Sequence, residues 1–209
     1  EIAQQPALWR QLADSLDLAQ ARIDAFLLPW LARPGTRVIF TGAGSSGFIA
    51  EMAADAANAA WPAEARAIHT TSLLTHPQLY LQRERPTLLV SFGRSGSSPE
   101  SVAAVDLVRA QVDEVRFLDI TCNAEGELAR RGAGRADTLA LRPRLRHDQQ
   151  PDLHAAGGAD CVRAGAVAAA AATAAGAVAA GRAAGHGVVA AGGRTGPAAV
   201  FAGDLPGQR

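Results

Sequence analysis

The residues best suited to bind an anion lie in the segment SFGRSGSSPES, positions 91 to 101. Its eleven positions hold five serines, two glycines and one arginine. Glycines let the backbone approach a ligand closely, and an arginine with successive backbone N–H groups favours a phosphoryl group. We therefore expect Arg94, Ser95 and Gly96 to form a cradle for phosphate.

A helix is predicted to begin directly after this cradle, and one serine can cap it. Ser97 followed by Glu100 resembles a capping box, whereas Pro99 at the first helical position favours Ser98 as the cap. Glu100 is explained by capping alone. Because either alternative uses only one serine, the other polar residues of the segment are available for a ligand.

A second glycine-rich segment, TGAGSSG at positions 41 to 47, matches the G-x-G-x-x-G pattern of dinucleotide-binding proteins. That pattern also requires an acidic residue about 20 positions later, at the end of the next strand, to bind the ribose hydroxyls. Here the next strand ends in AIHT, positions 67 to 70, and Glu64 precedes it at the opposite end of the sheet. A NAD-binding Rossmann domain is therefore only a remote alternative.

The serines of this second segment are more informative than its glycines. Ser45 and Ser46 stand at the expected start of a helix, where they either cap the helix or donate hydrogen bonds to a ligand. Both serine-containing segments follow strands of one predicted parallel sheet, and open α/β sheets bind ligands at the carboxyl ends of their strands. Two converging hydroxyl-rich loops with one arginine favour a sugar phosphate, which offers one dianion and several hydroxyls.

Hydrophobic periodicity predicts the elements that hold these loops. The strands are expected at 36–42, 65–70, 86–93, 115–122 and 136–143, and the helices at 8–31, 45–61, 98–112 and 124–131. One face of the helix at 45–61 is expected to present Phe48, Ile49, Met52, Ala53 and Ala56. Alternation of strand and helix indicates an α/β fold, a three-layer α/β/α sandwich with a five-stranded parallel sheet of the flavodoxin-like type.

Composition argues against several classes of partner. The formal net charge is zero, which gives no indication of a nucleic acid or an anionic membrane as partner. All 20 basic residues are arginines, so a lysine Schiff base is not expected. Cys122 and Cys161 are too few for a disulfide scaffold or a metal site. Since neither a secretory signal nor a membrane span is evident, we expect a cytoplasmic protein.

The composition changes near position 149. Positions 150 to 209 contain 22 alanines and 12 glycines among 60 residues. One explanation is a flexible linker, and the other, which we favour, is a reading-frame error in a GC-rich gene. We therefore divide the chain into an N-terminal helix at 1–34, a ligand-binding domain at 35–149 and an Ala/Gly-rich irregular tail at 150–209.

Five segments occur in an order that resembles a known family: TGAGSSGFIAE, TTSLLTHPQLYL, LLVSFGRSGSSPESVAAVDL, ITCNAEGELA and RHDQ. Over about positions 1 to 149 the chain resembles a sugar-isomerase (SIS) domain. Specifically, it is similar to the first of two such domains in the galactosamine-6-phosphate deaminase / tagatose-6-phosphate ketose-aldose isomerase family. The resemblance implies that the loop at 91–101 contacts phosphate and that the loop at 41–47 faces the sugar. With the residues above, it gives the candidate substrate-binding set Gly44, Ser45, Ser46, Gly93, Arg94, Ser95, Gly96, Ser97 and Ser98.

The resemblance also implies a reaction and an assembly. The reaction is deamination of an amino-sugar phosphate to a ketose phosphate, or aldose–ketose isomerisation. Either requires ring opening and then a proton moved between C1 and C2 by a carboxylate or a histidine. No metal or organic cofactor is implied, and SIS domains typically form homo-oligomers. A noncatalytic sugar-phosphate sensor is the alternative, although such sensors usually carry a basic DNA-binding helix-turn-helix that the front of this chain lacks.

No catalytic residue is assigned from the sequence. The family pattern stops after position 149, where a second SIS domain follows in the family, and related isomerases take their base and ring-opening histidine largely from beyond the first domain. We therefore expect a phosphate-binding half-site whose second domain is missing. His69 and His76 are expected in loops, with contact to a substrate hydroxyl as the alternative. His147 with Asp148 is a further candidate acid–base pair. Glu51 is expected to be a solvated or helix-pairing charge and not a base.

Overall fold

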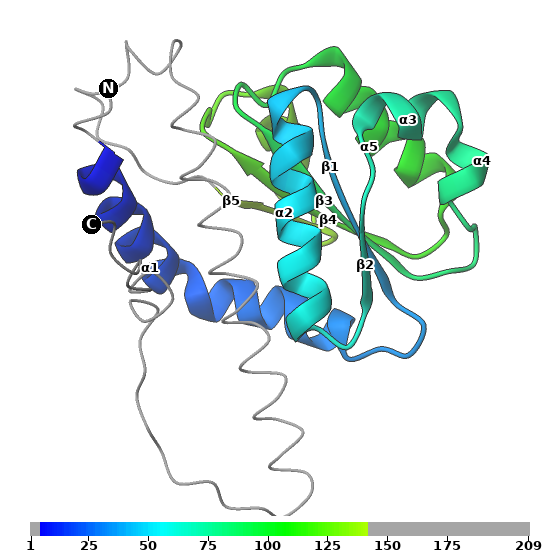
Figure 1. Ribbon diagram of the computed structural model, residues 1–209, viewed down its shortest axis with the longest axis horizontal. Helices are drawn as coiled ribbons and strands as arrows, with labels where there is room; N and C mark the ends of the chain where they lie inside the picture. Colours follow the sequence, from blue (N-terminus) through cyan, green and yellow to red (C-terminus); the bar gives the residue numbers. More distant parts are fainter. Residues whose placement is uncertain (1–4, 142–209) are drawn as a thin grey trace, which may run out of the picture.

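The structure is a computed structural model that describes residues 5–141 (Figure 1). Along the chain the elements are α1 (Gln5–Leu31), β1 (Arg37–Gly42), α2 (Ser45–Ala60), β2 (Glu64–Ala67), α3 (Thr70–Thr75), α4 (Pro77–Tyr80), β3 (Thr87–Gly93), α5 (Pro99–Gln111), β4 (Val115–Thr121), α6 (Glu127–Gly132) and β5 (Thr138–Leu141). All the predicted strands and helices are present, with ends that differ from the predictions by three residues or fewer.

The five strands form one parallel sheet, as the sequence predicts, and the structure gives their order as β2-β1-β3-β4-β5. The chain passes from β1 outward to β2 on one side, and then crosses to β3 on the other side of β1. In the register of β1 and β3, Gly42 lies beside Phe92. The loops after these two strands therefore leave the sheet at the same level, at the switch point where open α/β sheets bind ligands.

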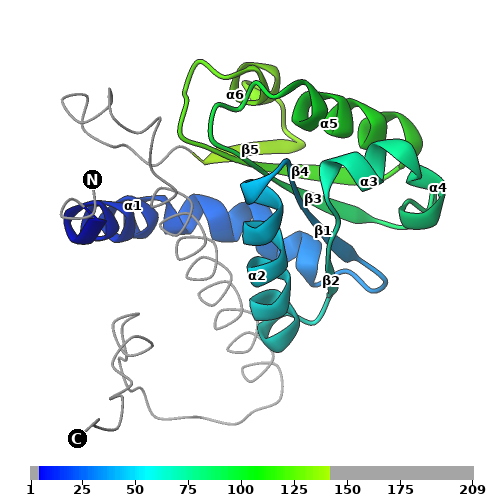
Figure 2. The same cartoon turned by 45° about the horizontal axis from the view of Figure 1, so that its top comes forward.

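Helices cover both faces of the sheet, which confirms the three-layer sandwich. Val38 and Phe40 of β1 point to the face that packs against α1 and α2, whereas Ile39 between them points to the face that packs against α3, α5 and α6. Figure 2 shows α1 and α2 on one side of the sheet and α3, α5 and α6 on the other. Since every residue of β1 and β3 is buried, these strands are apolar or small at nearly every position.

The last turns of α1 pack on the sheet through a cationic contact as well as through apolar side chains. Leu27 and Leu31 are buried in the core on this face. Arg116 of β4 donates from Nη1 to the carbonyl oxygen of Phe26 at 2.7 Å, and its guanidinium carbon lies 5.0 Å from the centre of the Trp30 ring. The cation–π contact adds to burial in fixing this helix against β4.

The predicted buried face of α2 is partly wrong. Ile49 and Ala53 are buried as expected, but Phe48 and Met52 are 61 % and 64 % exposed. Instead, α2 turns its alanines, including Ala50 and Ala57, toward the sheet. Small side chains let the helix approach the strands closely, so the larger Phe48 and Met52 lie on the outer side.

The segment between β2 and β3 contains two short helices that the sequence analysis did not predict. These are α3 and α4, of six and four residues. Helices this short show no hydrophobic period, which explains why they were missed. The tail at 150–209, His147, Asp148 and Cys161 lie outside the described residues. None of the helices within residues 5–141 has the length and apolar character needed to cross a membrane.

Candidate functional site

A pocket of about 220 Å³ lies between the loops that follow β1 and β3. Its lining consists of Ala43, Ser45, Ser46, Phe92, Gly93, Arg94, Ser95, Ser98 and Ser101. Six of the nine candidate residues therefore meet around one pocket, although Ser45 and Arg94 are separated by almost fifty positions in the sequence. Gly44, Gly96 and Ser97 belong to the same loops but do not line the pocket.

Glycines shape the first loop so that α2 begins at the pocket. Gly44 is the N-cap of α2 and has a φ of +55°, a conformation that favours glycine. A Cβ on Gly42 would lie 2.5 Å from the backbone carbonyl of Ser46, so no larger residue fits there. Neither Ser45 nor Ser46 caps the helix, because Gly44 holds that position. Both serines instead lie in the first turn of α2, where the partial positive charge of a helix N-terminus favours an anion.

The second loop is shaped by Gly96. Its φ is +63°, and a Cβ at this position would lie 2.7 Å from Thr121 Oγ1. The same Thr121 hydroxyl donates to the carbonyl oxygen of Arg94 at 3.3 Å. Gly96 thus lets the loop fold back against the end of β4, which in turn holds the backbone of Arg94.

The serines after Gly96 have different surroundings. Ser98 is the N-cap of α5 and Pro99 occupies the first turn, which is the second of the two predicted capping alternatives. The Ser98 side chain makes no capping hydrogen bond and lines the pocket. The Ser97 hydroxyl accepts a hydrogen bond from the backbone N–H of Glu127 at 3.0 Å. Ser97 therefore connects the loop to α6, whereas Ser98 is available to a ligand.

Ser101 is a lining residue that the sequence analysis did not select. It is 3 % exposed, and its Oγ has no hydrogen-bond partner within the described residues. It lies three residues after Ser98, hence on the same side of α5. The three-residue spacing from Ser98 is the one feature of the sequence that could have identified Ser101 as a lining residue. A buried hydroxyl that lines a pocket without a partner favours a polar ligand there.

The lining favours a negative ligand. Arg94 is the only charged residue among the described residues that line the pocket. Two helices, α2 with 16 residues and α5 with 13, also begin at the pocket, and helix N-termini carry partial positive charge. The pocket therefore combines one guanidinium, two helix starts and several hydroxyls.

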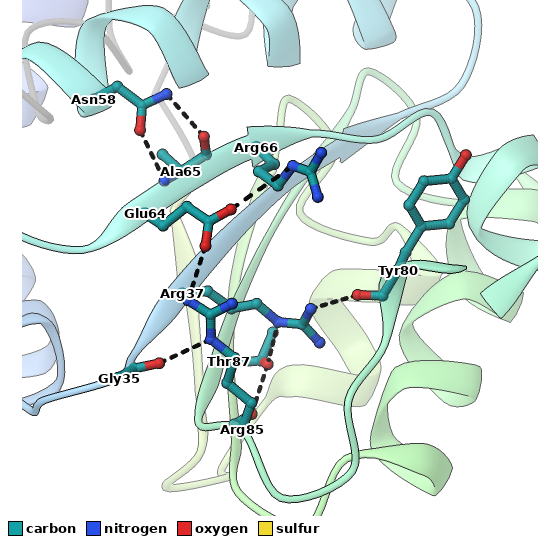
Figure 3. A network of polar contacts seen from close by, with 9 residues as sticks. All are labelled: Gly35, Arg37, Asn58, Glu64, Ala65, Arg66, Tyr80, Arg85 and Thr87. Carbon is teal, nitrogen blue, oxygen red and sulfur yellow. Dashed lines mark hydrogen bonds and ion pairs between the residues drawn. The ribbon is translucent and has the colours of Figure 1, made fainter. Parts of the chain in front are cut away.

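Glu64 does not supply the acidic residue that a dinucleotide would need. It is the first residue of β2 and therefore lies at the amino end of the sheet, opposite the pocket. There its Oε2 accepts from Arg85 Nη2 at 2.8 Å, and its Oε1 lies 3.8 Å from Arg66 Nε (Figure 3). Nearby, Arg37 donates from Nε to Thr87 Oγ1 at 3.0 Å. These polar contacts join β1, β2 and β3 at the end of the sheet that is remote from the pocket.

The two histidines within the described residues do not line the pocket. His69 lies two residues after the end of β2, and its Nε2 lies 3.1 Å from Glu51 Oε1 of α2, so Glu51 pairs with a side chain from outside its own helix. The ring also meets Phe48 edge to face, with ring centres 6.0 Å apart. His76 is exposed and its Nδ1 lies 2.9 Å from Thr75 Oγ1. In residues 5–141, no three His, Cys, Asp or Glu side chains gather as a metal site would require.

Comparisons with known proteins give a consistent result. No family model matches the chain. The D-galactosamine-6-phosphate deaminase AgaS of Shewanella sp. (strain ANA-3) is 46 % identical over 132 residues, which cover 62 % of this chain and 34 % of that protein. The putative D-galactosamine-6-phosphate deaminase AgaS of Streptomyces coelicolor is 43 % identical over 150 residues, which cover 71 % of this chain and 39 % of that protein.

A solved structure matches a similar share of the chain. Tagatose-6-phosphate ketose/aldose isomerase from Escherichia coli aligns with a TM-score of 0.65 and 39 % identity, over 68 % of this chain and 38 % of that chain. This chain therefore spans less than two fifths of the length of each of these three relatives.

Proposed function

This chain carries a sugar-isomerase (SIS) domain of the galactosamine-6-phosphate deaminase / tagatose-6-phosphate ketose-aldose isomerase type, and from that premise we propose that its pocket binds an amino-sugar or keto-sugar 6-phosphate. One observation carries the proposal. Among the described residues that line the pocket at the switch point, Arg94 is the only charged one, and two helices begin there.

The phosphate is assigned to the loop after β3. Arg94 offers guanidinium N–H donors, which form strong charge-assisted bonds with a phosphate dianion. Ser95, Ser98 and Ser101 line the same side and add hydroxyl donors. Ser45 and Ser46 line the opposite side and are assigned to the sugar hydroxyls. Such a site binds the substrate through its non-reacting phosphate and thereby orients the carbons that react.

The proposed reaction is loss of ammonia from the amino sugar, or interconversion of aldose and ketose. Both need a group that moves a proton between C1 and C2. The described lining residues include no carboxylate and no histidine, so this pocket anchors the substrate and the proton-transfer group comes from elsewhere. A cytoplasmic location and a homo-oligomer formed through SIS domains belong to the same proposal.

The same lack of an acid or base in the described lining favours one second candidate, a noncatalytic sugar-phosphate sensor. The two candidates differ in turnover. Incubation of the full chain with galactosamine 6-phosphate releases ammonia if it is a deaminase, and converts tagatose 6-phosphate if it is an isomerase. A sensor binds these compounds and leaves them unchanged.

Titration calorimetry of the full chain tests whether phosphate is the recognised group. We expect galactosamine 6-phosphate to bind and unphosphorylated galactosamine to give no measurable heat, because the pocket's charged contact is made with phosphate. Fructose 6-phosphate extends the test to a ketose. Binding of NADH without binding of any sugar phosphate would contradict the proposal and favour a dinucleotide site.

A further inference from the structure

Three polar side chains form a row across the centre of the sheet, just below the pocket. In the strand register, Thr41 of β1 pairs with Ser91 of β3, and Ser91 pairs with Asp119 of β4. The three residues are between 1 % and 2 % exposed. They lie two residues further along their strands than Ile39, Leu89 and Phe117, hence on the same face, which α5 covers. The row therefore lies between that core and the pocket.

Within residues 5–141, several side-chain oxygens in this row lack hydrogen-bond partners. Thr41 Oγ1, Ser91 Oγ and Asp119 Oδ1 have no hydrogen-bond partner of good geometry within the described residues. The same is true of Ser101 Oγ, which lines the pocket from α5. Because an unsatisfied buried polar atom is costly, four of them on adjoining elements at one end of the sheet require an explanation.

The surroundings of Asp119 favour the neutral carboxylic acid. Within the described residues it makes no ion pair, because the nearby Arg109 pairs with Asp137 and stacks on the Phe117 ring at 4.1 Å. On the α6 side, a Cβ on Gly132 would lie 3.5 Å from Asp119 Oδ2, so that helix presents no charge there. Burial raises the pKa of Asp119 to about 7, opposed by the Ser91 hydroxyl and by Arg109, and increased further by the charge of Asp137.

Asp119 is also close to the pocket. Gly93, which lines the pocket, pairs with Thr121, and Asp119 is two residues before Thr121 in the same strand. Two strand residues and one strand spacing separate the Cα atoms of Asp119 and Gly93 by about 8 Å. The intervening space is filled by buried strands, where screening is weak.

We propose that Asp119 sets the pH range over which the pocket binds an anion: the neutral acid permits binding, and loss of its proton places a buried negative charge beneath the bound anion and weakens binding. This inference rests on the proposed phosphate site. By linkage, the anion also favours the protonated form, so binding near neutral pH takes up a proton. Bound anion and Asp119 proton therefore stabilise each other.

Sulfate is the probe, because it remains a dianion across the pH range in which sugar phosphates themselves titrate. Its dissociation constant is measured by calorimetry with the full chain from pH 5.5 to 8.5 at constant ionic strength. We expect binding to begin to weaken near pH 7 and to be about tenfold weaker by pH 8.5. Asp119→Asn should bind at all pH values as the wild type does at low pH. Asp113→Asn, an exposed control, should keep the wild-type profile.

A second readout needs no variant. At pH 7, calorimetry in buffers of different ionisation enthalpy should report proton uptake with sulfate binding, and at pH 5.5 little or none. Sulfate binding that does not change with pH, or proton uptake that persists in Asp119→Asn, overturns this inference and leaves the proposed phosphate site intact. If neither sulfate nor galactosamine 6-phosphate binds at any pH, the proposed site fails and the inference fails with it.

Discussion

The hydroxyl oxygen of Ser97 accepts the backbone N–H of Glu127 at 3.0 Å, which joins the arginine-containing loop to the first residue of α6. The next N–H of this helix, from Leu128, donates to the carbonyl oxygen of Gly96 at 2.8 Å. Two of the N–H groups that a helix start leaves unpaired are thus satisfied by the loop. The loop that presents Arg94 is therefore held from behind by α6.

Replacing Ser97 should loosen this attachment without removing a ligand contact. Ser97→Ala is expected to lower the free energy of unfolding by about 1 kcal/mol, since it leaves the Glu127 N–H without this acceptor. Urea unfolding measures the change. Ser72→Ala is the control, because the Ser72 hydroxyl makes no hydrogen bond in the described part of the chain. Equal stability of the two variants would show that the Ser97 bond contributes nothing.

Gly96→Ala should be more damaging than the same substitution at another glycine with positive φ. At Gly96 the new methyl would lie 2.7 Å from Thr121 Oγ1 and push against the group that holds the Arg94 backbone. At Gly134, where φ is +75°, nothing lies within 4 Å of the methyl. Gly134→Ala should therefore cost about 1 kcal/mol of backbone strain alone. Gly96→Ala should cost more than that and also weaken sugar-phosphate binding, which thermal unfolding and calorimetry would reveal.

The free energy of unfolding should depend on pH through the protonation of Asp119. Its pKa is about 7 in the folded chain and near the ordinary value of 3.8 when unfolded, so between these values the folded state holds the extra proton. Stability from this group is complete below about pH 4 and is lost as pH rises through about 7. The wild type should lose a few kcal/mol over this window relative to Asp119→Asn. Urea unfolding at several pH values measures the difference, and parallel profiles for the two proteins would contradict the buried neutral acid.

Substitution of the two neighbours Phe48 and Ile49 should cost different amounts of stability. Ile49→Ala removes a side chain that is 3 % exposed and should cost about 2 to 4 kcal/mol. Phe48→Ala removes one that is 61 % exposed and whose ring contact is with His69, so it should cost under about 1 kcal/mol. Chemical denaturation of both variants tests the orientation of α2. A larger loss of stability for Phe48→Ala than for Ile49→Ala would contradict this orientation of α2.

The fold and the position of the pocket follow from patterns that are local in sequence. Alternating strands and helices define the parallel sheet, and glycine- and serine-rich segments after β1 and β3 define its ligand-binding edge. The sequence also correctly predicts that Glu64 lies at the amino end of the sheet, where it cannot bind the ribose of a dinucleotide. Its position at the start of a single strand is enough for that prediction.

The remaining features depend on packing between distant segments. Thr41, Ser91 and Asp119 become neighbours only through the strand register, and no pattern in the sequence joins them. Ser97 and Ser98 are adjacent and chemically identical, yet Ser97 contacts α6 and Ser98 lines the pocket. The reason is that Gly96, just before them, turns the loop back against β4. Phe48 lies on the outer side because the small alanines let α2 approach the sheet closely. Hydrophobic periodicity takes no account of side-chain size, so it does not predict this.

The central claim, that Arg94 binds the phosphate of a sugar phosphate in this pocket, is tested most directly by one calorimetric comparison. Galactosamine 6-phosphate is titrated into the wild type, Arg94→Ala and Arg83→Ala, the last being an arginine whose side chain is 73 % exposed and does not line the pocket. Loss of a charge-assisted contact should weaken binding to Arg94→Ala by about 10- to 100-fold, while Arg83→Ala binds as the wild type does. Equal affinity of all three proteins for galactosamine 6-phosphate would contradict the account.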